Sequence, residues 1–376
     1  MAARRTTNSQ SRATQNYITD RVIFSRAWRV KRDMNATHPI PPLDAGRLSA
    51  RRQAARRNAA IATDMMAECR LCARDCGVDR SHGPAGACAA PAQARMFDFS
   101  VDWSGEAGLA PCAIVSLSGC NLSCAFCIVA RESQNALLGE PLEASAVAAC
   151  IDQQTPQIQS FSVLGGEPTI HLPSVLDLVS QVSVGTPFVW KTNACASEAA
   201  LPLIADVADV VLADFKFGND ACARRLAAFP RYMATVQMNL RFWRERGTPL
   251  IVRHLLMPGH LDCCLQPIVD WMARELPDAT LSLMPGYRPT HRAASMPDLA
   301  RRIRPDETQR ATDMVRAAGV ALHPWVTSPP PAAAVAPAAE ADDIWIDATG
   351  CIHGLAANGP LAACLRNLQK EFHVGA

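Results

Sequence analysis

The sequence lacks the features that would place it in several common classes of protein. Neither sign of charge is in excess, because 37 Lys and Arg residues face 35 Asp and Glu residues and the net charge is +2. Such a balance gives no global attraction to nucleic acid or to an acidic membrane. No run of about 18 uncharged apolar residues occurs, so we expect no membrane-spanning helix. No secretory signal follows Met1, and we expect a cytoplasmic protein.

The chain does contain enough apolar material for a large buried core. Hydrophobic residues make up 49% of the sequence and charged residues 19%, which excludes a wholly disordered or collagen-like chain. A length of 376 residues suggests two to three domains, although a barrel can use most of such a length alone. The first 19 residues are rich in Arg, Ser and Thr and contain no acid. We interpret them as a basic tail in preference to a transit peptide.

Alternating apolar runs and helical patterns in residues 111–327 predict β/α units and a parallel sheet. Strands are expected at 112–117, 160–164, 187–191, 209–215, 250–255 and 279–284. Helices are expected between them, at 142–153, 172–183, 231–246 and 263–275. Six such units favour an α/β fold of the partial (β/α)6 TIM-like barrel type over a closed eight-fold barrel.

The regions around this barrel are expected to be smaller and less regular. Residues 1–64 are interpreted as a basic, loosely ordered segment with an exposed helix at Arg47–Arg57, and residues 65–110 as a cysteine-rich module. Residues 328–340 are a Pro/Ala linker, and residues 341–376 are predicted to form a small hairpin–helix appendage. No internal repeat of fixed period is found.

Fifteen cysteines are the most informative part of the composition. An odd number in a large chain with a good core does not fit a disulfide scaffold, and clustered cysteines in such a chain indicate metal or cluster ligands first. Their positions therefore matter more than their number. Seven fall into two groups, and we interpret the other eight, including Cys263 and Cys264, as small core residues.

The first group is a C-x3-C-x2-C run directly after the strand expected at 112–117. It consists of Cys120, Cys124 and Cys127. Iron–sulfur clusters are held by such runs, normally with four thiolates. Three protein thiolates would leave one iron open to a substrate or cofactor, and the loop lies at the carboxyl end of a barrel strand, where such folds place their chemistry. A zinc ion with a distant fourth ligand, or simple packing, is the alternative.

This run, with Phe126 just before its last cysteine, resembles the radical S-adenosylmethionine (SAM) superfamily over residues 65–325. The resemblance implies a [4Fe–4S] cluster held by the three cysteines, whose open iron chelates SAM. It further implies reductive cleavage of the SAM sulfonium to a 5′-deoxyadenosyl radical. Phe126 would then lie near the adenine.

Motifs at later strand ends extend the resemblance, which assigns SAM-binding or catalytic roles to their residues. The Gly-Gly-Glu motif places two glycines and an acceptor for the SAM ammonium after the second strand, and adjacent glycines allow close approach of a ligand. Thr-Asn and Asp-x-Lys segments like those of glycyl-radical activating enzymes follow the third and fourth strands, and an arginine suited to a carboxylate ends the fifth. These residues are Gly165, Gly166, Glu167, Thr192, Asn193, Asp214, Lys216 and Arg253. A strand-end turn, cap or surface ion pair is the alternative for each.

The second cysteine group reads C-x2-C-x3-C-x11-C and consists of Cys69, Cys72, Cys76 and Cys88. Four thiolates could close a tetrahedral zinc site or complete a second iron–sulfur cluster. Similar N-terminal quartets occur in the uncharacterised branch of pyruvate formate-lyase activating enzyme homologues. The Arg253–His260 and Tyr287–Pro289 stretches also resemble that branch.

The resemblance implies an oxidoreductase that cleaves SAM and then abstracts a hydrogen atom. We expect a protein or peptide substrate, as in glycyl-radical activation, and a ferredoxin- or flavodoxin-type electron donor. A small metabolite as substrate is the first alternative. A non-catalytic iron–sulfur or zinc module is the second, but it does not explain why the supporting motifs all fall at strand ends. Neither nucleic acid nor membrane is expected as a partner.

Overall fold

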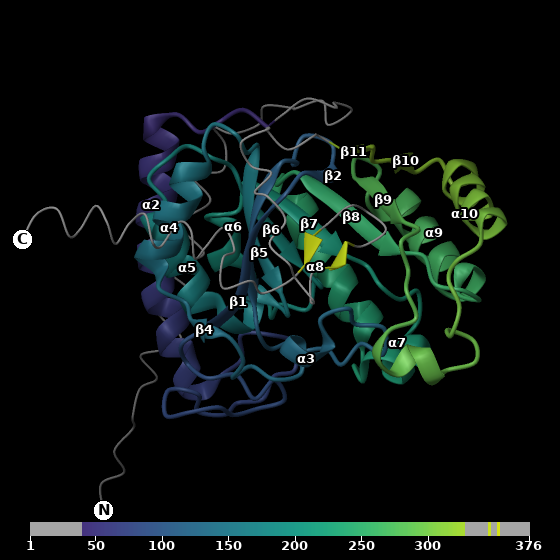
Figure 1. Ribbon diagram of the computed structural model, residues 1–376, viewed down its shortest axis with the longest axis horizontal. Helices are drawn as coiled ribbons and strands as arrows, with labels where there is room; N and C mark the ends of the chain where they lie inside the picture. The colour runs from purple at the N-terminus through teal and green to yellow at the C-terminus, as the bar shows by residue number, and fades with distance from the viewer. Residues whose placement is uncertain (1–39, 328–344, 347–351, 354–376) are drawn as a thin grey trace, which may run out of the picture. The chain divides into compact units, whose positions relative to one another are not determined.

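A nine-stranded sheet forms the centre of the fold (Figure 1). The computed structural model describes residues 40–327 and two short strands at 345–346 and 352–353. The strand order is β10-β9-β8-β7-β6-β5-β3-β1-β4. From β3 to β10 the neighbours run parallel, whereas β1 (Arg95–Asp102) and β4 (Glu140–Pro141) add antiparallel strands at one edge. The predicted partial barrel is confirmed, because the order ends at β4 and β10 and does not close.

The parallel strands follow the six predicted apolar runs closely, and a short seventh strand joins them. Their side chains are mostly buried, as in a parallel sheet covered on both faces. This burial explains why the runs are continuously apolar instead of alternating. The parallel strands are β3 (Cys112–Leu117), β5 (Ser160–Gly165), β6 (Phe188–Thr192), β7 (Val210–Asp214), β8 (Leu250–Leu255), β9 (Thr280–Met284) and β10 (Ala321–Leu322).

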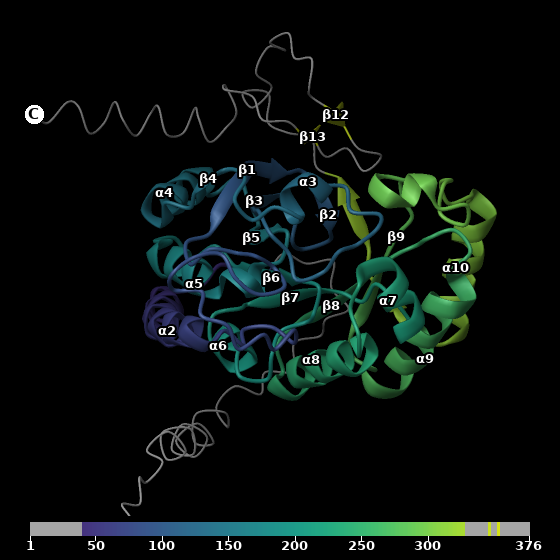
Figure 2. The ribbon, with the colours of Figure 1, turned by 90° about the horizontal axis from the view of Figure 1, so that it is seen from below.

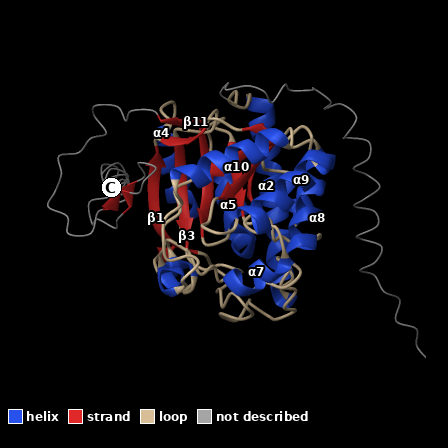
Figure 3. Cartoon of the chain, turned by 90° about the vertical axis from the view of Figure 1, so that its right-hand side faces the viewer, coloured by secondary structure: helices blue, strands red, loops and turns tan. Residues whose placement is uncertain are grey.

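Helices connect the parallel strands and follow one another around the outside of the sheet (Figure 2). Figure 3 shows α2, α5, α8 and α9 beside the strands on one side of the sheet. The connecting helices are α4 (Ala144–Gln154), α5 (Leu172–Gln181), α6 (Leu201–Ala205), α7 (Asp220–Ala227), α8 (Tyr232–Arg246), α9 (Gln266–Glu275) and α10 (Pro305–Ala317). Shorter helical pieces are α3 (Ala130–Ser133), 3-10 turns at Met65–Glu68, Pro168–His171 and His291–Ser295, and a π-turn at Leu261–Leu265.

Helix α2 (Ala45–Asp64) differs from the expectation of a loosely ordered segment through residue 64. It packs against α5, and small alanine side chains on its inner face allow the close approach. Arg51 is buried, and its Nη1 donates to Asp209 Oδ2 at 2.8 Å and to the Thr186 carbonyl at 2.9 Å. The sequence predicts an exposed helix because an arginine that forms a buried ion pair cannot be distinguished from a solvent-exposed arginine by sequence alone.

Residues 95–110 belong partly to the sheet, although the sequence placed them in the cysteine-rich module. Strand β1 pairs antiparallel with β3, and Met96 and Phe99 point into the core. Strand β2 (Ser104–Glu106) pairs with β11 (Trp325–Thr327) in a separate two-stranded sheet. This second pairing brings the ends of the expected barrel region together.

Parts of the flanking segments lie outside the described residues. These parts are the basic N-terminal residues 1–39, the Pro/Ala linker, and the predicted turn and helix of the C-terminal appendage. Two short strands of the appendage are described, β12 (Trp345–Ile346) and β13 (Ile352–His353), and they pair antiparallel. Within the described part of the chain, no helix combines the length and apolar character needed to cross a membrane.

Candidate active site

The loop that carries the cysteine triad leaves β3 at the carboxyl end of the parallel sheet. Backbone hydrogen bonds fix it to two neighbouring helices. Gly119 N donates to the Glu132 carbonyl of α3 at 2.9 Å. Ser123 N and Ala125 N donate to the carbonyls of Ala227 and Leu226, at the end of α7, at 3.0 and 2.6 Å. The position of the three cysteines therefore depends on α7.

The sulfur atoms of the triad lie in a buried environment with hydrogen-bond donors around them. Leu122 N donates to Cys120 Sγ at 3.4 Å, and Ser133 Oγ lies 3.2 Å from Cys127 Sγ. Burial raises the pKa of the Cys124 thiol to about 12 and that of Cys120 well above its ordinary range, and the neighbouring thiols add to both shifts. Thiols in this state need a cation before they become ligands.

The triad does not form a compact single-ion site. Among the described residues, its three sulfur atoms are not part of a group with all ligand atoms within 4.8 Å of one another. In a cubane cluster each cysteine binds its own iron, so the sulfurs stand farther apart than around one metal ion. The donor set and its spread therefore fit a cluster better than a zinc ion.

The two glycines of the Gly-Gly-Glu motif pack against the triad loop. Gly165 has φ +105°, and a Cβ there would lie 2.5 Å from Leu117 N. At Gly166 a Cβ would lie 1.5 Å from the Gly119 carbonyl oxygen. Gly166 N donates to the Leu117 carbonyl at 2.7 Å, and Glu167 N to that of Gly119 at 3.0 Å. The glycines were expected to admit a ligand, and what they admit in this structure is the backbone that precedes Cys120.

We expect Gly166→Ala to displace the triad loop. A Cβ cannot occupy a position 1.5 Å from a backbone oxygen, so the loop must shift, at a cost of about 1–3 kcal/mol or more. Iron retained per chain after anaerobic reconstitution should fall, together with the melting temperature. The matched control is Gly46→Ala, where a Cβ in the first turn of α2 meets only Asp44 Oδ1 at 3.3 Å. Wild-type iron content and stability in Gly166→Ala would contradict this role.

Glu167 joins the ends of β5 and β6 through its carboxylate. Oε1 accepts from the Thr169 and Thr192 hydroxyls at 2.6 and 2.7 Å and from Thr169 N at 3.2 Å, while Oε2 accepts from Asn193 N at 2.8 Å. The side chain is buried, and this burial raises its pKa although the hydrogen bonds oppose the shift. A buried carboxylate of this kind favours a cationic partner.

Asn193 lies between the triad and the Gly-Gly-Glu motif. Its Nδ2 donates to Asn121 Oδ1 at 2.7 Å and lies 3.9 Å from Cys120 Sγ. Its backbone N–H is held by Glu167. Strand β6 thus places Thr192 and Asn193 beside the loop that carries the cysteines.

Asp214 and Lys216 form an ion pair at the end of β7, and both side chains are about one-fifth exposed. Burial alone would lower the pKa of Lys216, but Asp214 and the Cys124 and Cys120 thiols raise it above its ordinary value. Burial likewise opposes the lowered pKa of Asp214, which Lys216 and Arg253 produce. Lys216 is therefore a cation that faces the triad.

Arg253 faces a carboxylate that the sequence reasoning missed. Its Nε and Nη2 donate to Glu106 Oε1 and Oε2 at 2.7 and 2.8 Å, and Ser282 Oγ donates to Oε1 at 2.9 Å. Arg253 aligns with Asp214 and Ser282 across β7, β8 and β9, so their side chains share one face of the sheet. Glu106 reaches this face from β2, and no motif marked it in the sequence.

The remaining predicted residues of this end of the barrel are packed into the core. Phe126 contacts Phe217 edge-on at 6.0 Å between ring centroids, and Tyr287 lies 6.2 Å from it. His254 is buried, with Nδ1 2.7 Å from the Phe215 carbonyl, and burial lowers its pKa to about 4. His254 is thus a structural histidine.

The N-terminal quartet lines one small pocket beside the triad loop. Cys69, Cys72, Cys76 and Cys88 all contribute to its wall. Two arginines tie this module to the barrel. Arg80 Nη1 donates to the Ile170 carbonyl at 2.8 Å and lies 3.5 Å from Cys69 Sγ. Arg74 Nε donates to the Asn121 carbonyl, one residue after Cys120, at 2.9 Å. The quartet and the triad are therefore neighbours in space.

Comparison with known proteins agrees with this geometry. The family model of the radical SAM superfamily matches residues 114–272, from β3 through most of α9. An uncharacterized protein of Methanocaldococcus jannaschii is 30% identical over 262 residues, which cover 68% of this chain and 76% of that protein. The chain belongs to the radical SAM superfamily.

Similarity to solved structures is weaker, with TM-scores below 0.5. Streptococcus suis SuiB bound to the precursor peptide SuiA is 14% identical with a TM-score of 0.42, covering 54% of this chain. This chain spans 45% of SuiB. A radical SAM methyltransferase from Sphaerobacter thermophilus is 16% identical with a TM-score of 0.44, covering 58% of this chain and 67% of that one. A domain of a pyruvate-formate lyase-activating enzyme from Bacteroides vulgatus is 16% identical with a TM-score of 0.35, covering 43% and 95%.

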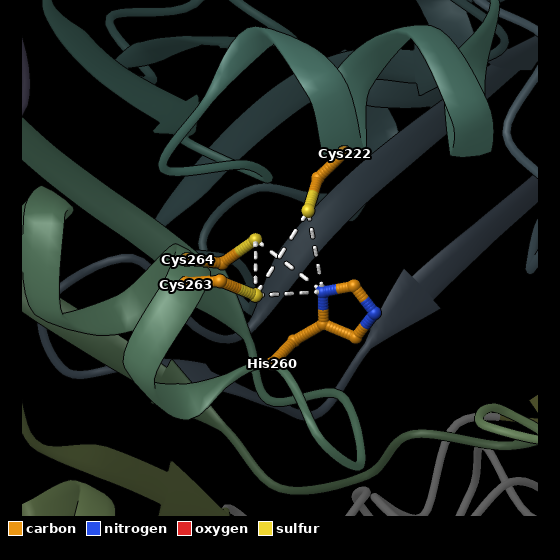
Figure 4. A group of neighbouring side chains, drawn as sticks. All are labelled: Cys222, His260, Cys263 and Cys264. Atoms are coloured by element: carbon orange, nitrogen blue, oxygen red, sulfur yellow. Dashed lines mark hydrogen bonds between the residues drawn. The ribbon is translucent and has the colours of Figure 1, made fainter.

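Membership of the radical SAM superfamily supports an enzyme and implies SAM and a [4Fe–4S] cluster as cofactors. One group of side chains lies outside everything that this family resemblance predicted. Cys222, His260, Cys263 and Cys264 bring four ligand atoms within 4.8 Å of one another (Figure 4). Cys263 and Cys264 had been interpreted as core residues without ligand spacing, and a His-x2-Cys-Cys run at 260–264 was the signal that could have found them.

Proposed function

We propose that this chain is a radical SAM enzyme that abstracts a hydrogen atom from a protein or peptide. The observation that carries the proposal is the loop after β3, where Cys124 is buried and Cys120 and Cys127 are partly buried. Cys124 and Cys120 lie within electrostatic reach of Lys216, and Cys120 adjoins Asn193 and, through Asn193, Glu167. Cys120, Cys124 and Cys127 would hold the cluster. When bound, the cluster and SAM supply a one-electron reductive cleavage whose product removes a hydrogen atom from the substrate.

The polar residues around the triad have distinct tasks in this proposal. Lys216 supplies positive charge to the thiolates and to the carboxylate of SAM, and Asp214 holds its ammonium group in place. Glu167 accepts the ammonium group of SAM, which would relieve the cost of burying a carboxylate. Thr192 and Asn193 orient Glu167 by hydrogen bonds. Gly165 and Gly166 set the position of the loop, and Phe126 shapes its wall.

Arg253 has a positioning role in this proposal. Its guanidinium fork is occupied by Glu106, so we assign the SAM carboxylate to Lys216 in the first place. The charge of Arg253 also lowers the pKa of Asp214, which keeps Asp214 ionised as the partner of Lys216. Arg253 therefore acts on the site through Glu106 and Asp214.

Lys216→Met should raise the KM for SAM by about 10–100-fold, the cost of losing a charge-assisted hydrogen bond of about 1.5–3 kcal/mol. Lys216→Arg, which keeps the charge, should retain most of the affinity. The double variant Lys216→Met/Asp214→Asn removes the carboxylate that the single variant leaves unpaired, and should fold as well as the wild type while still binding SAM weakly. An unchanged KM in Lys216→Met would contradict the proposed role.

The test of the activity is anaerobic. The full chain is reconstituted with iron and sulfide, reduced with dithionite and given SAM. Release of 5′-deoxyadenosine supports the proposal, whereas a reconstituted protein that leaves SAM intact contradicts it. Iron near four or near eight per chain then shows whether the quartet of Cys69, Cys72, Cys76 and Cys88 holds a second cluster or another metal such as zinc.

A polypeptide substrate is favoured because the strand order does not close, which leaves the barrel open at the β4 and β10 ends. His254, near the end of β8, is buried with Nδ1 against the Phe215 carbonyl, so it is not available to line a pocket for a small metabolite. The test is stimulation of 5′-deoxyadenosine release by fractions of a cell extract. Stimulation by the fraction retained on an ultrafiltration membrane, and its loss after protease treatment, support a polypeptide. Stimulation by the filtrate alone contradicts it.

A further inference from the structure

Four side chains from three segments converge beyond the carboxyl ends of β7 and β8. Cys222 lies in the first turn of α7, His260 ends the loop after β8, and Cys263 and Cys264 lie in the π-turn Leu261–Leu265 (Figure 4). His260 Nδ1 faces all three sulfur atoms, at 3.7 Å from Cys222, 3.4 Å from Cys263 and 3.5 Å from Cys264. His260 and Cys264 are buried, and the other two are half-buried.

Five of the six separations match the edges of a metal tetrahedron, and the sixth, between the Cys222 and Cys264 sulfurs, is within 4.8 Å. With Zn–S bonds of about 2.3 Å and Zn–N bonds of about 2.0 Å, tetrahedral angles place two sulfurs about 3.8 Å apart and a sulfur and a nitrogen about 3.5 Å apart. The Cys222–Cys263 and Cys263–Cys264 sulfur pairs are both 3.9 Å apart. The three nitrogen–sulfur distances lie between 3.4 and 3.7 Å.

We propose that Cys222, His260, Cys263 and Cys264 form a Cys3His site for a single Zn²⁺ ion. Three thiolates and an imidazole are ligands that select zinc over hard cations such as Mg²⁺ or Ca²⁺. Four protein ligands complete the coordination, so the ion is structural and has no open position for catalysis. This site is separate from the radical SAM triad and from the N-terminal quartet, which share none of its residues.

The surroundings of Cys222 support a bound thiolate. Asn219 Nδ2 donates to Cys222 Sγ at 3.3 Å and to the Cys263 carbonyl at 2.7 Å, and its Oδ1 accepts from Cys222 N at 2.8 Å. Asn219 thereby joins the two segments that supply three of the ligands. A Cβ at Gly218 would lie 2.2 Å from the Cys264 carbonyl oxygen, so glycine there allows the two segments to meet.

The second ring nitrogen of His260 lies beside the ion pair of Arg225 and Asp298. Metal-bound histidines commonly donate their other N–H to a carboxylate. Asp298 Oδ2 lies 3.7 Å from His260 Nε2, and Arg225 Nη2 lies 2.6 Å from the same oxygen. Arg225 Nη2 also lies 3.2 Å from His260 Nε2. With zinc on Nδ1 the proton lies on Nε2, so Arg225 must turn away from Nε2 before Asp298 can accept that proton. Arg225 balances the net negative charge of three thiolates around one divalent ion.

The site has a consequence for the triad loop. Cys222 binds at the start of α7, while the last residues of that helix, Leu226 and Ala227, accept the hydrogen bonds from Ala125 and Ser123. Zinc would fasten α7 to the loop after β8 and so hold the support of the cluster loop. The zinc proposal does not depend on the proposed SAM chemistry, and bound zinc is measured without any turnover.

The test measures zinc per chain in the full-length protein, grown with added zinc and dialysed against a weak chelator. Cys222→Ser and Cys263→Ser should each hold one equivalent of zinc per chain less than the wild type. Any metal that the N-terminal quartet binds is common to all these proteins and does not change this difference. Cys112→Ser, a half-buried cysteine at the start of β3, is the matched control and should hold as much as the wild type. His260→Cys, which replaces the imidazole by a fourth thiolate, should keep the equivalent, whereas His260→Ala should lose it.

The same samples give a second readout that does not require every variant to be stable. Added Zn²⁺ should raise the melting temperature of the zinc-stripped wild type and of His260→Cys by more than that of His260→Ala. Equal zinc contents in the wild type, Cys222→Ser and His260→Ala would overturn the proposal. A Cys222–Cys263 disulfide in the wild-type protein, together with an unchanged zinc content in Cys222→Ser, would overturn it as well. The two cysteines would then form a redox pair.

Discussion

Cys124→Ala is expected to abolish the release of 5′-deoxyadenosine. Without this thiolate the loop after β3 keeps two of three cluster ligands, and iron–sulfur clusters need a nearly complete set of cysteines. Loss of a residue that hydrogen-bonds a metal ligand already lowers metal affinity or activity by about 10–100-fold. Loss of a ligand itself should therefore reduce the rate of 5′-deoxyadenosine release by more than about 100-fold. The measurement is 5′-deoxyadenosine per unit time after anaerobic reconstitution and reduction, with iron per chain determined on the same sample.

Cys112→Ala is the matched control for this result. Cys112 begins β3, whereas the triad follows the end of that strand, and its sulfur contacts the carbonyl of Ala113 and the side chain of Ser160. It should retain both iron and activity. Cys124→Ser offers a second variant of nearly equal volume if alanine disturbs the fold. Activity near that of the wild type in a folded Cys124→Ala protein would show that the triad does not hold the cluster.

Glu106→Gln is expected to destabilise the protein by about 3–5 kcal/mol, the cost of removing one partner from a buried ion pair. Burial opposes ionisation of Glu106, but Arg253 lowers its pKa to about 2. In the variant the guanidinium of Arg253 loses its paired carboxylate. The negative charge of Asp214 offsets only part of that loss. Chemical denaturation at pH 7 measures the change in the free energy of unfolding.

The effect should depend on pH in a defined direction. An unfolded glutamate titrates near pH 4.3, and in the folded chain the pKa is about 2. Stability from the ionised form is therefore complete above about pH 4.3 and is lost as the pH falls toward 2. The difference between wild type and Glu106→Gln should shrink over that range. Glu275→Gln, which breaks the half-exposed pair with Arg241, should cost at most about 1 kcal/mol. An equal cost for both variants would contradict the account.

The sequence predicted the parallel part of the fold well for a physical reason. Strands β3, β5, β6, β7, β8 and β9 are buried on both faces, so each appears as a short apolar run between helices. The burial of helix α2 and the presence of strand β1 were missed because their inward residues are small or alternate with polar ones. In the sequence Arg51 resembles a surface cation, and only the fold places Asp209 beside it.

The candidate site was predictable where chemistry is local in sequence and hidden where it is not. Cys120, Cys124 and Cys127 share one loop, so their spacing was enough to indicate a cluster. Glu106 pairs with Arg253, which is 147 positions away in the sequence. No sequence motif indicates the β2–β11 pairing that brings Glu106 there. Cys222 and His260 are 38 positions apart, and only the packing of α7 against the loop after β8 brings them together.

The glycines of the Gly-Gly-Glu motif show a third kind of difference. The sequence predicted that its glycines admit a ligand, whereas Gly166 is required by the carbonyl of Gly119. The same residue type answers both needs, because both ask for a missing Cβ. Only the coordinates distinguish which backbone or ligand occupies the space.

The most direct test of the central claim is the electron paramagnetic resonance spectrum of the reduced, reconstituted protein with and without SAM. If three cysteines hold a [4Fe–4S] cluster with one open iron, addition of SAM must change the g values of the reduced cluster, and must do so in the wild type but not in Cys124→Ala. A reduced cluster whose spectrum is identical before and after addition of SAM would contradict the claim.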